Sequence, residues 1–130
     1  MLDKTEYWLD LCDDDLVTAK ALYDAGRLLH MGFFCHLIAE KALKATVAKK
    51  TNEIPPKTHD LRRLAEAGCV VAELSNEQLG LLQELTPLQI EARYPAYKDA
   101  INATLTKEYC NRILSETEAF LCWIKQRLER

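Results

Sequence analysis

The sequence predicts an all-α protein, a four- or five-helix up-and-down bundle in which residues 1–130 form one domain. Apolar residues make up 48% of the chain, which is enough to bury a single core. Only four glycines and four prolines interrupt 130 residues, whereas an all-β fold needs many tight turns. Long segments also repeat apolar residues at three- and four-residue steps, which is typical of amphipathic helices.

The first helix is expected to begin after Asp3, because Asp3 can cap it and Glu6 stands three residues later. Gly26 is expected to end it. Its apolar stripe consists of Trp8, Leu11, Cys12, Leu16, Ala19, Leu22 and Tyr23. The residues between them are mostly charged.

The second helix is predicted over residues 29–50. Its apolar surface is broad, which favours a central helix with neighbours on more than one side. Residues 51–57 form a loop, since Pro55 and Pro56 cannot continue a helix.

Three further helices complete the prediction. A short one runs from Thr58 or His59 to residue 67, with Thr58 as its cap. Residues 75–78 have capping-box form and open the fourth helix, which Pro87 should kink or divide and Pro95 should close. The last helix is expected over residues 104–128.

Composition excludes several classes of function. The net charge is −3, so binding to nucleic acid through bulk electrostatics is not expected. The chain has no apolar run long enough for a membrane span and no signal-peptide pattern at its start. The five cysteines form no C-x-x-C pair, so they are expected to be reduced thiols that fill the core. These features indicate a cytoplasmic protein without a metal or another cofactor.

Three stretches resemble HEPN domains. Residues 35–45 read CHLIAEKALKA, residues 58–64 read THDLRRL, and residues 90–95 read IEARYP. Their order and spacing resemble the family's AEKALKA, THDL and ARYP elements. The resemblance implies a HEPN-like bundle that forms two-fold homodimers, and a protein that works beside a nucleotidyltransferase in toxin–antitoxin or other defence systems.

The catalytic members of that family cleave RNA with an arginine followed four to six residues later by a histidine. Such a pair is chemically sensible, because the imidazole moves a proton and the guanidinium holds the phosphate. The histidines of this chain are His30, His36 and His59, and Arg27 is the only arginine that precedes any of them closely. Neither spacing from Arg27 satisfies the motif, and no histidine follows Arg93. No catalytic residue is therefore predicted.

Three groups of residues are candidates for binding. His36, Glu40 and Lys44 fall within an arc of roughly 80° on one helix, with Lys41 beside them. They form either an exposed face with a Glu40–Lys44 ion pair or a polar groove for a phosphate or an acidic partner.

The second group is His59 and Asp60, which stand where a helix N-terminus could attract an anion, although ordinary capping explains them as well. The third group is Arg93, Tyr94 and Tyr97. These residues suit nucleotide contacts or a dimer seam, or Arg93 simply pairs with a nearby carboxylate.

Three functions remain open at this point. The favoured one is a non-catalytic HEPN homodimer that acts by binding a nucleotidyltransferase or another toxin–antitoxin or defence component. The second is a sensor domain that binds a nucleotide or another small anion. The third is a divergent metal-independent ribonuclease, in which His36 or His59 meets an arginine brought close by the fold.

Overall fold

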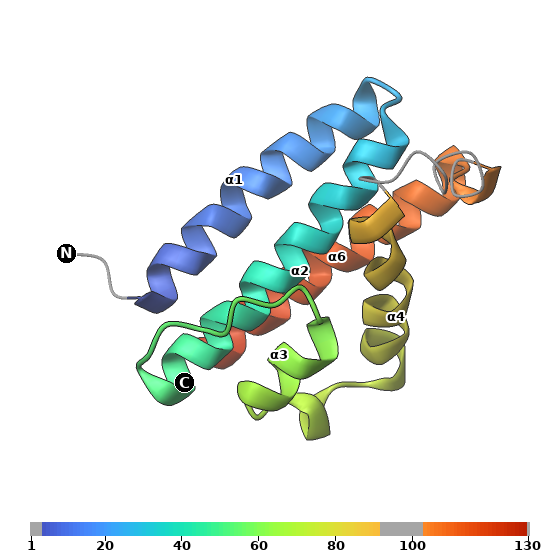
Figure 1. Ribbon diagram of the computed structural model, residues 1–130. Coiled ribbons are helices and arrows are strands. Elements are labelled where there is room, and N and C mark those ends of the chain that lie inside the picture. The colour runs from blue at the N-terminus through green and yellow to red at the C-terminus, as the bar shows by residue number, and fades with distance from the viewer. Residues whose placement is uncertain (1–3, 92–102, 130) are drawn as a thin grey trace.

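The computed structural model describes residues 4–91 and 103–129 (Figure 1). Within these ranges every regular element is helical, which confirms the all-α prediction. The elements are α1 (Lys4–Asp24), α2 (Leu28–Thr51), α3 (Leu61–Ala67), the short 3₁₀ helix η1 (Val71–Glu73), α4 (Asn76–Glu91) and α6 (Lys107–Leu128). The four long helices alternate in direction along the chain, and α3 and η1 lie in the connection between α2 and α4 (Figure 1).

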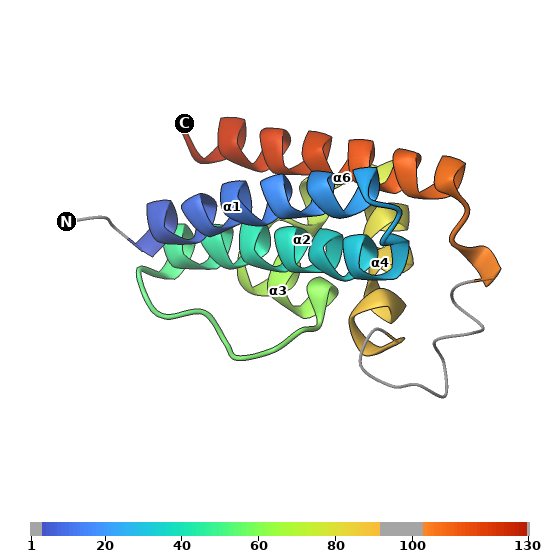
Figure 2. The same cartoon turned by 90° about the horizontal axis from the view of Figure 1, so that it is seen from above.

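Helix α2 lies at the centre of the bundle (Figure 2). It packs against α1, α3, α4 and α6, which confirms that its broad apolar surface meets several neighbours. Ile38 and Leu43 of α2 are completely buried, and Leu85 of α4 and Ile124 of α6 are buried against the same core. Burying a side chain of this size stabilises the fold by about 1.5–3 kcal/mol, so α2 fixes the positions of the helices around it.

The turn between α1 and α2 follows the sequence pattern closely. Gly26 has a positive φ of 75°, a conformation that glycine adopts without steric cost. The N–H of Gly26 donates to the carbonyl of Tyr23, and the N–H of Arg27 donates to that of Leu22. This pair of bonds is the Schellman motif that commonly ends a helix. The three residues 25–27 therefore suffice to reverse the chain.

Helix α3 begins later than predicted, and its cap is Asp60 rather than Thr58. The Asp60 carboxylate accepts a hydrogen bond from the backbone N–H of Arg63 at 3.1 Å. The Thr58 hydroxyl instead accepts from the N–H of Asp60, which bends the chain just before the helix. His59 consequently lies outside α3, and its side chain reaches across to α2. The helix therefore begins at Leu61, and His59 of the preceding segment contacts Glu40.

The ends of helices α4 and α6 agree only in part with the predictions from the sequence. Ser75 and Gln78 form the predicted capping box, since each side chain accepts from the other residue's backbone N–H. Pro87 lies inside α4 and does not divide it, since the helix runs continuously to Glu91, whereas the kink at Pro87 stays a prediction. The last helix begins at Lys107 rather than at residue 104 as predicted, and the Thr106 hydroxyl caps it by accepting from the N–H of Tyr109. The predicted end at Pro95 lies outside the described residues.

The cysteines are free thiols, and Cys12, Cys35 and Cys110 fill the core as predicted. Burial raises the pKa of both Cys12 and Cys35 to about 12, which makes these two thiols poor nucleophiles. Cys69 and Cys122 are exposed instead. In the part of the chain that the structure describes, no helix is long and apolar enough to cross a membrane.

Candidate functional site

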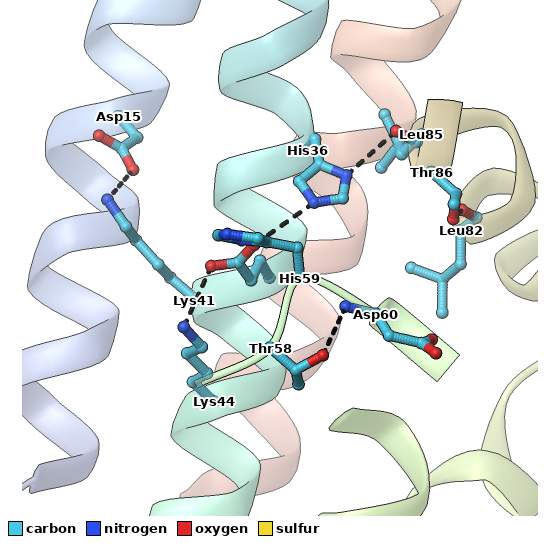
Figure 3. Close-up of polar contacts among 11 residues, drawn as sticks. Asp15, His36, Lys41, Lys44, Thr58, His59, Asp60, Leu82, Leu85 and Thr86 are labelled. Carbon is cyan, nitrogen blue, oxygen red and sulfur yellow. Dashed lines mark hydrogen bonds and ion pairs between the residues drawn. The ribbon is translucent and has the colours of Figure 1, made fainter. Parts of the chain in front are cut away.

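Four of the predicted site residues meet in one polar cluster, in which the buried Glu40 is surrounded by His36, Lys44 and His59 (Figure 3). We call these four residues the Glu40 network. His36, Glu40 and Lys44 come from α2, where residues four positions apart lie on one face. His59 comes from the segment that leads into α3. The network therefore fastens residues distant in sequence to the central helix.

Both carboxylate oxygens of Glu40 are engaged. Oε2 accepts a hydrogen bond from Lys44 Nζ at 3.1 Å, and Oε1 accepts one from His59 Nδ1 at 2.8 Å. The side chain is only 4% exposed, so burial alone would raise its pKa. The nearby His36, His59 and Lys44 outweigh that effect and lower the pKa of Glu40 to about 2. Glu40 is therefore a buried anion whose charge is balanced by its neighbours.

His36 lies on the inner side of Glu40 and is 1% exposed. Its Nδ1 donates to the backbone carbonyl of Leu85 in α4 at 3.0 Å, because a carbonyl oxygen can only accept. Its Nε2 lies 3.4 Å from Glu40 Oε1 and makes no hydrogen bond with any described residue. His36 thus connects α2 to α4 across the core.

The lysines of this face are also occupied. Lys41 Nζ lies 2.7 Å from Asp15 Oδ2 of α1. Lys44, besides its bond to Glu40, holds its ammonium 5.2 Å from the ring centroid of Trp8, also in α1. The interpretation of this surface as an exposed helix face is wrong, because His36 and Glu40 are buried and the two lysines contact α1. The Glu40–Lys44 ion pair itself is present, but it is buried.

The other predicted residues divide into two groups. The Asp60 carboxylate caps α3 by accepting from the N–H of Arg63. The anion at this helix N-terminus is therefore a side chain of the protein itself. The His59 side chain is 51% exposed, although its Nδ1 is bonded to Glu40. Arg93, Tyr94 and Tyr97 lie outside the described residues, and their role stays a prediction.

A second polar cluster, between α4 and α6, was missed by the sequence analysis. Glu84 accepts hydrogen bonds from the Tyr109 hydroxyl at 2.9 Å and from Arg112 Nη2 at 2.7 Å. Burial and the Glu84 carboxylate raise the pKa of Tyr109 to about 12. The sequence signal for it was weak, because only Arg112 and Glu116, four residues apart on α6, are visible as a local pair.

The outward face of α1 carries the most exposed apolar groups of any described helix. We call Tyr7, Asp10, Asp14, Val17 and Ala21 the outer stripe of α1, since all five are exposed and their spacing places them on one side. Val17 is 71% exposed and Tyr7 is 51% exposed. Asp10 also lines a cleft of about 440 Å³ at the start of the helix, where carboxylates outnumber ammonium groups. This face is therefore acidic with apolar groups between the charges.

Comparison with known proteins agrees with this architecture. The family model of the HEPN domain matches residues 5–128. The chain belongs to the HEPN family. The crystal structure of ST0689, an archaeal HEPN homologue, superposes with a TM-score of 0.66 and covers 98% of this chain and 99% of that one. At 20% identity that likeness shows the fold alone. No curated protein matches.

The structure gives the HEPN-like sequence stretches a physical role. The AEKALKA stretch supplies Glu40 and Lys44, and the THDL stretch supplies His59 and the cap Asp60. The two stretches meet in the Glu40 network, so in this HEPN protein they fasten the connecting segment to the central helix.

Proposed function

We propose that this HEPN protein acts by binding rather than by cleaving RNA, as a homodimer that partners a nucleotidyltransferase or another toxin–antitoxin or defence component. The observation that carries the proposal is the burial of His36 within the Glu40 network. His36 is sealed in the core and cannot reach a phosphodiester. The sequence also lacks the family's arginine–histidine spacing.

The outer stripe of α1 supports a protein partner. Val17 and Tyr7 are exposed on the same side of α1 with charged residues between them, and we infer that a partner covers them. The charged members of the stripe, Asp10 and Asp14, are both carboxylates. A second copy that docked stripe to stripe would bring like charges together, so we place the homodimer interface elsewhere. The partner that fits the stripe carries basic residues around apolar ones.

Co-expression with the product of the neighbouring gene tests the proposal. We expect the two proteins to co-elute in size-exclusion chromatography, with a light-scattering mass that corresponds to two copies of this chain plus its partner. Val17→Asp should weaken the complex, whereas Ile54→Asp, which changes an equally exposed apolar residue in the connecting segment, should not. A monomer with no partner, together with RNA cleavage by the purified chain, would contradict the proposal.

A second candidate function, a divergent metal-independent ribonuclease, has one observation in its favour. His59 donates from Nδ1 to the buried carboxylate of Glu40 and leaves the other side of its ring toward solvent. A carboxylate that orients an imidazole in this way is a common arrangement for a general base. Cleavage assays on structured RNA with His59→Ala and Arg93→Ala decide it, since cleavage must be present in the native chain and lost in His59→Ala.

A further inference from the structure

His36 is buried with an oxygen acceptor in front of each of its ring nitrogens (Figure 3). Nδ1 lies 3.0 Å from the carbonyl oxygen of Leu85, and Nε2 lies 3.4 Å from Oε1 of Glu40. Carbonyl and ionised carboxylate oxygens accept hydrogen bonds but cannot donate them. Both nitrogens are therefore in positions that call for an N–H.

A neutral imidazole cannot meet that demand, because it carries only one N–H. The tautomer protonated at Nδ1 turns the Nε2 lone pair toward the Glu40 carboxylate. The tautomer protonated at Nε2 turns the Nδ1 lone pair toward the Leu85 carbonyl. In a site that is 1% exposed, neither repulsion is relieved by solvent. Only the doubly protonated ring carries an N–H on both sides, so that Nδ1 donates to Leu85 while the charged ring faces the Glu40 carboxylate.

We infer that His36 and Glu40 form a buried imidazolium–carboxylate pair, and that this pair is a pH-sensitive latch for the segment that carries His59. The link is one atom, since Glu40 Oε1 both faces His36 and accepts the hydrogen bond from His59. When His36 loses its proton from Nε2, the lone pair of that nitrogen points toward Glu40 Oε1 and repels it. The carboxylate relieves the repulsion by turning away, and its bond to His59 is then lost.

The titratable groups around the His36–Glu40 pair are His59, which bonds Oε1 of Glu40, and the lysines and carboxylates of the neighbouring ion pairs. Lys44, on the same helix as Glu40, donates a hydrogen bond to the other carboxylate oxygen, Oε2. From α1, Asp15 is engaged by Lys41, and Lys20 pairs with Glu118 of α6. From α4, the contact with His36 is a backbone carbonyl, which does not titrate.

The direction of the pH effect follows from which state holds the proton. The latched state binds a proton at His36 that the open state releases, so raising the pH favours the open state. Opening frees residues 58–60 from α2 and removes the support of the α3 N-terminus. The hydrogen bond from His36 Nδ1 to the Leu85 carbonyl persists when Nε2 loses its proton, because Nδ1 keeps its own proton.

Histidine side-chain NMR on the full-length, unmodified protein tests the inference without any substitution. We expect both ring nitrogens of His36 to show imidazolium chemical shifts and both N–H protons to be protected from exchange. A neutral His36, with one protonated and one bare nitrogen throughout the pH range in which the protein is folded, would overturn the inference.

Amide hydrogen exchange tests the latch itself. After correction for the intrinsic rate, exchange in residues 58–67 should rise at least fivefold from the acidic to the basic end of the pH range in which the protein is folded. His36→Gln should abolish this dependence, whereas His30→Gln, which changes an exposed histidine of the same helix, should retain it. Exchange in residues 58–67 that rises equally in the native protein and in His36→Gln would refute the coupling. In His59→Gln, residues 58–67 should exchange rapidly at every pH while the His36 imidazolium signals persist.

Discussion

The substitution Glu40→Gln removes the charge at the centre of the Glu40 network while keeping the shape of the side chain. The pKa of Glu40 falls from the ordinary value of 4.5 to about 2 in the folded protein. At roughly 1.4 kcal/mol per pKa unit, a difference of about 2.5 units corresponds to about 3 kcal/mol of stability at neutral pH. The side chain is buried, so solvent screening removes little of this energy. We therefore expect Glu40→Gln to lower the free energy of unfolding by about 3 kcal/mol.

Urea denaturation as a function of pH provides the measurement. Because the folded-state pKa of Glu40 is depressed, its contribution is fully present above pH 4.5 and is lost as the pH falls toward about 2. The free energy of unfolding of the native protein should fall by about 3 kcal/mol between pH 4.5 and about 2, and that of Glu40→Gln should not show this fall. Glu66→Gln is the matched control, since Glu66 pairs with Arg62 on the surface, where such pairs contribute about 0.3–0.5 kcal/mol. A loss below about 1 kcal/mol for Glu40→Gln, or an unchanged acid profile, would refute the reasoning.

Other predictions concern caps, packing and ligand binding. Asp60→Ala should lower the free energy of unfolding by about 1 kcal/mol through loss of the α3 cap, measured by urea denaturation. Gly68→Ala should cost about 1–3 kcal/mol in the same assay, because the new Cβ would collide with the Thr46 hydroxyl and backbone contacts near it. In a thermal-shift panel of nucleotides we expect no stabilisation, since Lys41 and Lys44 are held by carboxylates. A shift of several degrees that saturates with one nucleotide would revive the sensor function.

Local patterns in the sequence predicted most of the fold correctly. The periodicity of α2, the capping box at Ser75 and the turn at Gly26 depend on residues a few positions apart, so they are visible in a single chain. The end of α2 was also placed within a residue of its observed position at Thr51.

The candidate site was predicted only in part. The helical arc brought His36, Glu40 and Lys44 together correctly, but it gave no sign that α4, the segment before α3 and α1 would bury them. The sequence showed neither that Asp60 rather than Thr58 caps α3 nor that His59 contacts Glu40. The partner of His36 Nδ1 is a backbone carbonyl, which carries no signature in any sequence.

The three-residue turn between α1 and α2 has a consequence for how the chain folds. These two helices make the most extensive helix–helix contact of the bundle, and joining them closes a very short loop at little entropic cost. The α1–α2 hairpin should therefore assemble early, and α6, whose contact with α2 spans a long stretch of chain, should add late. Stopped-flow kinetics should show that Ala19→Gly slows refolding, whereas Ile124→Val mainly accelerates unfolding.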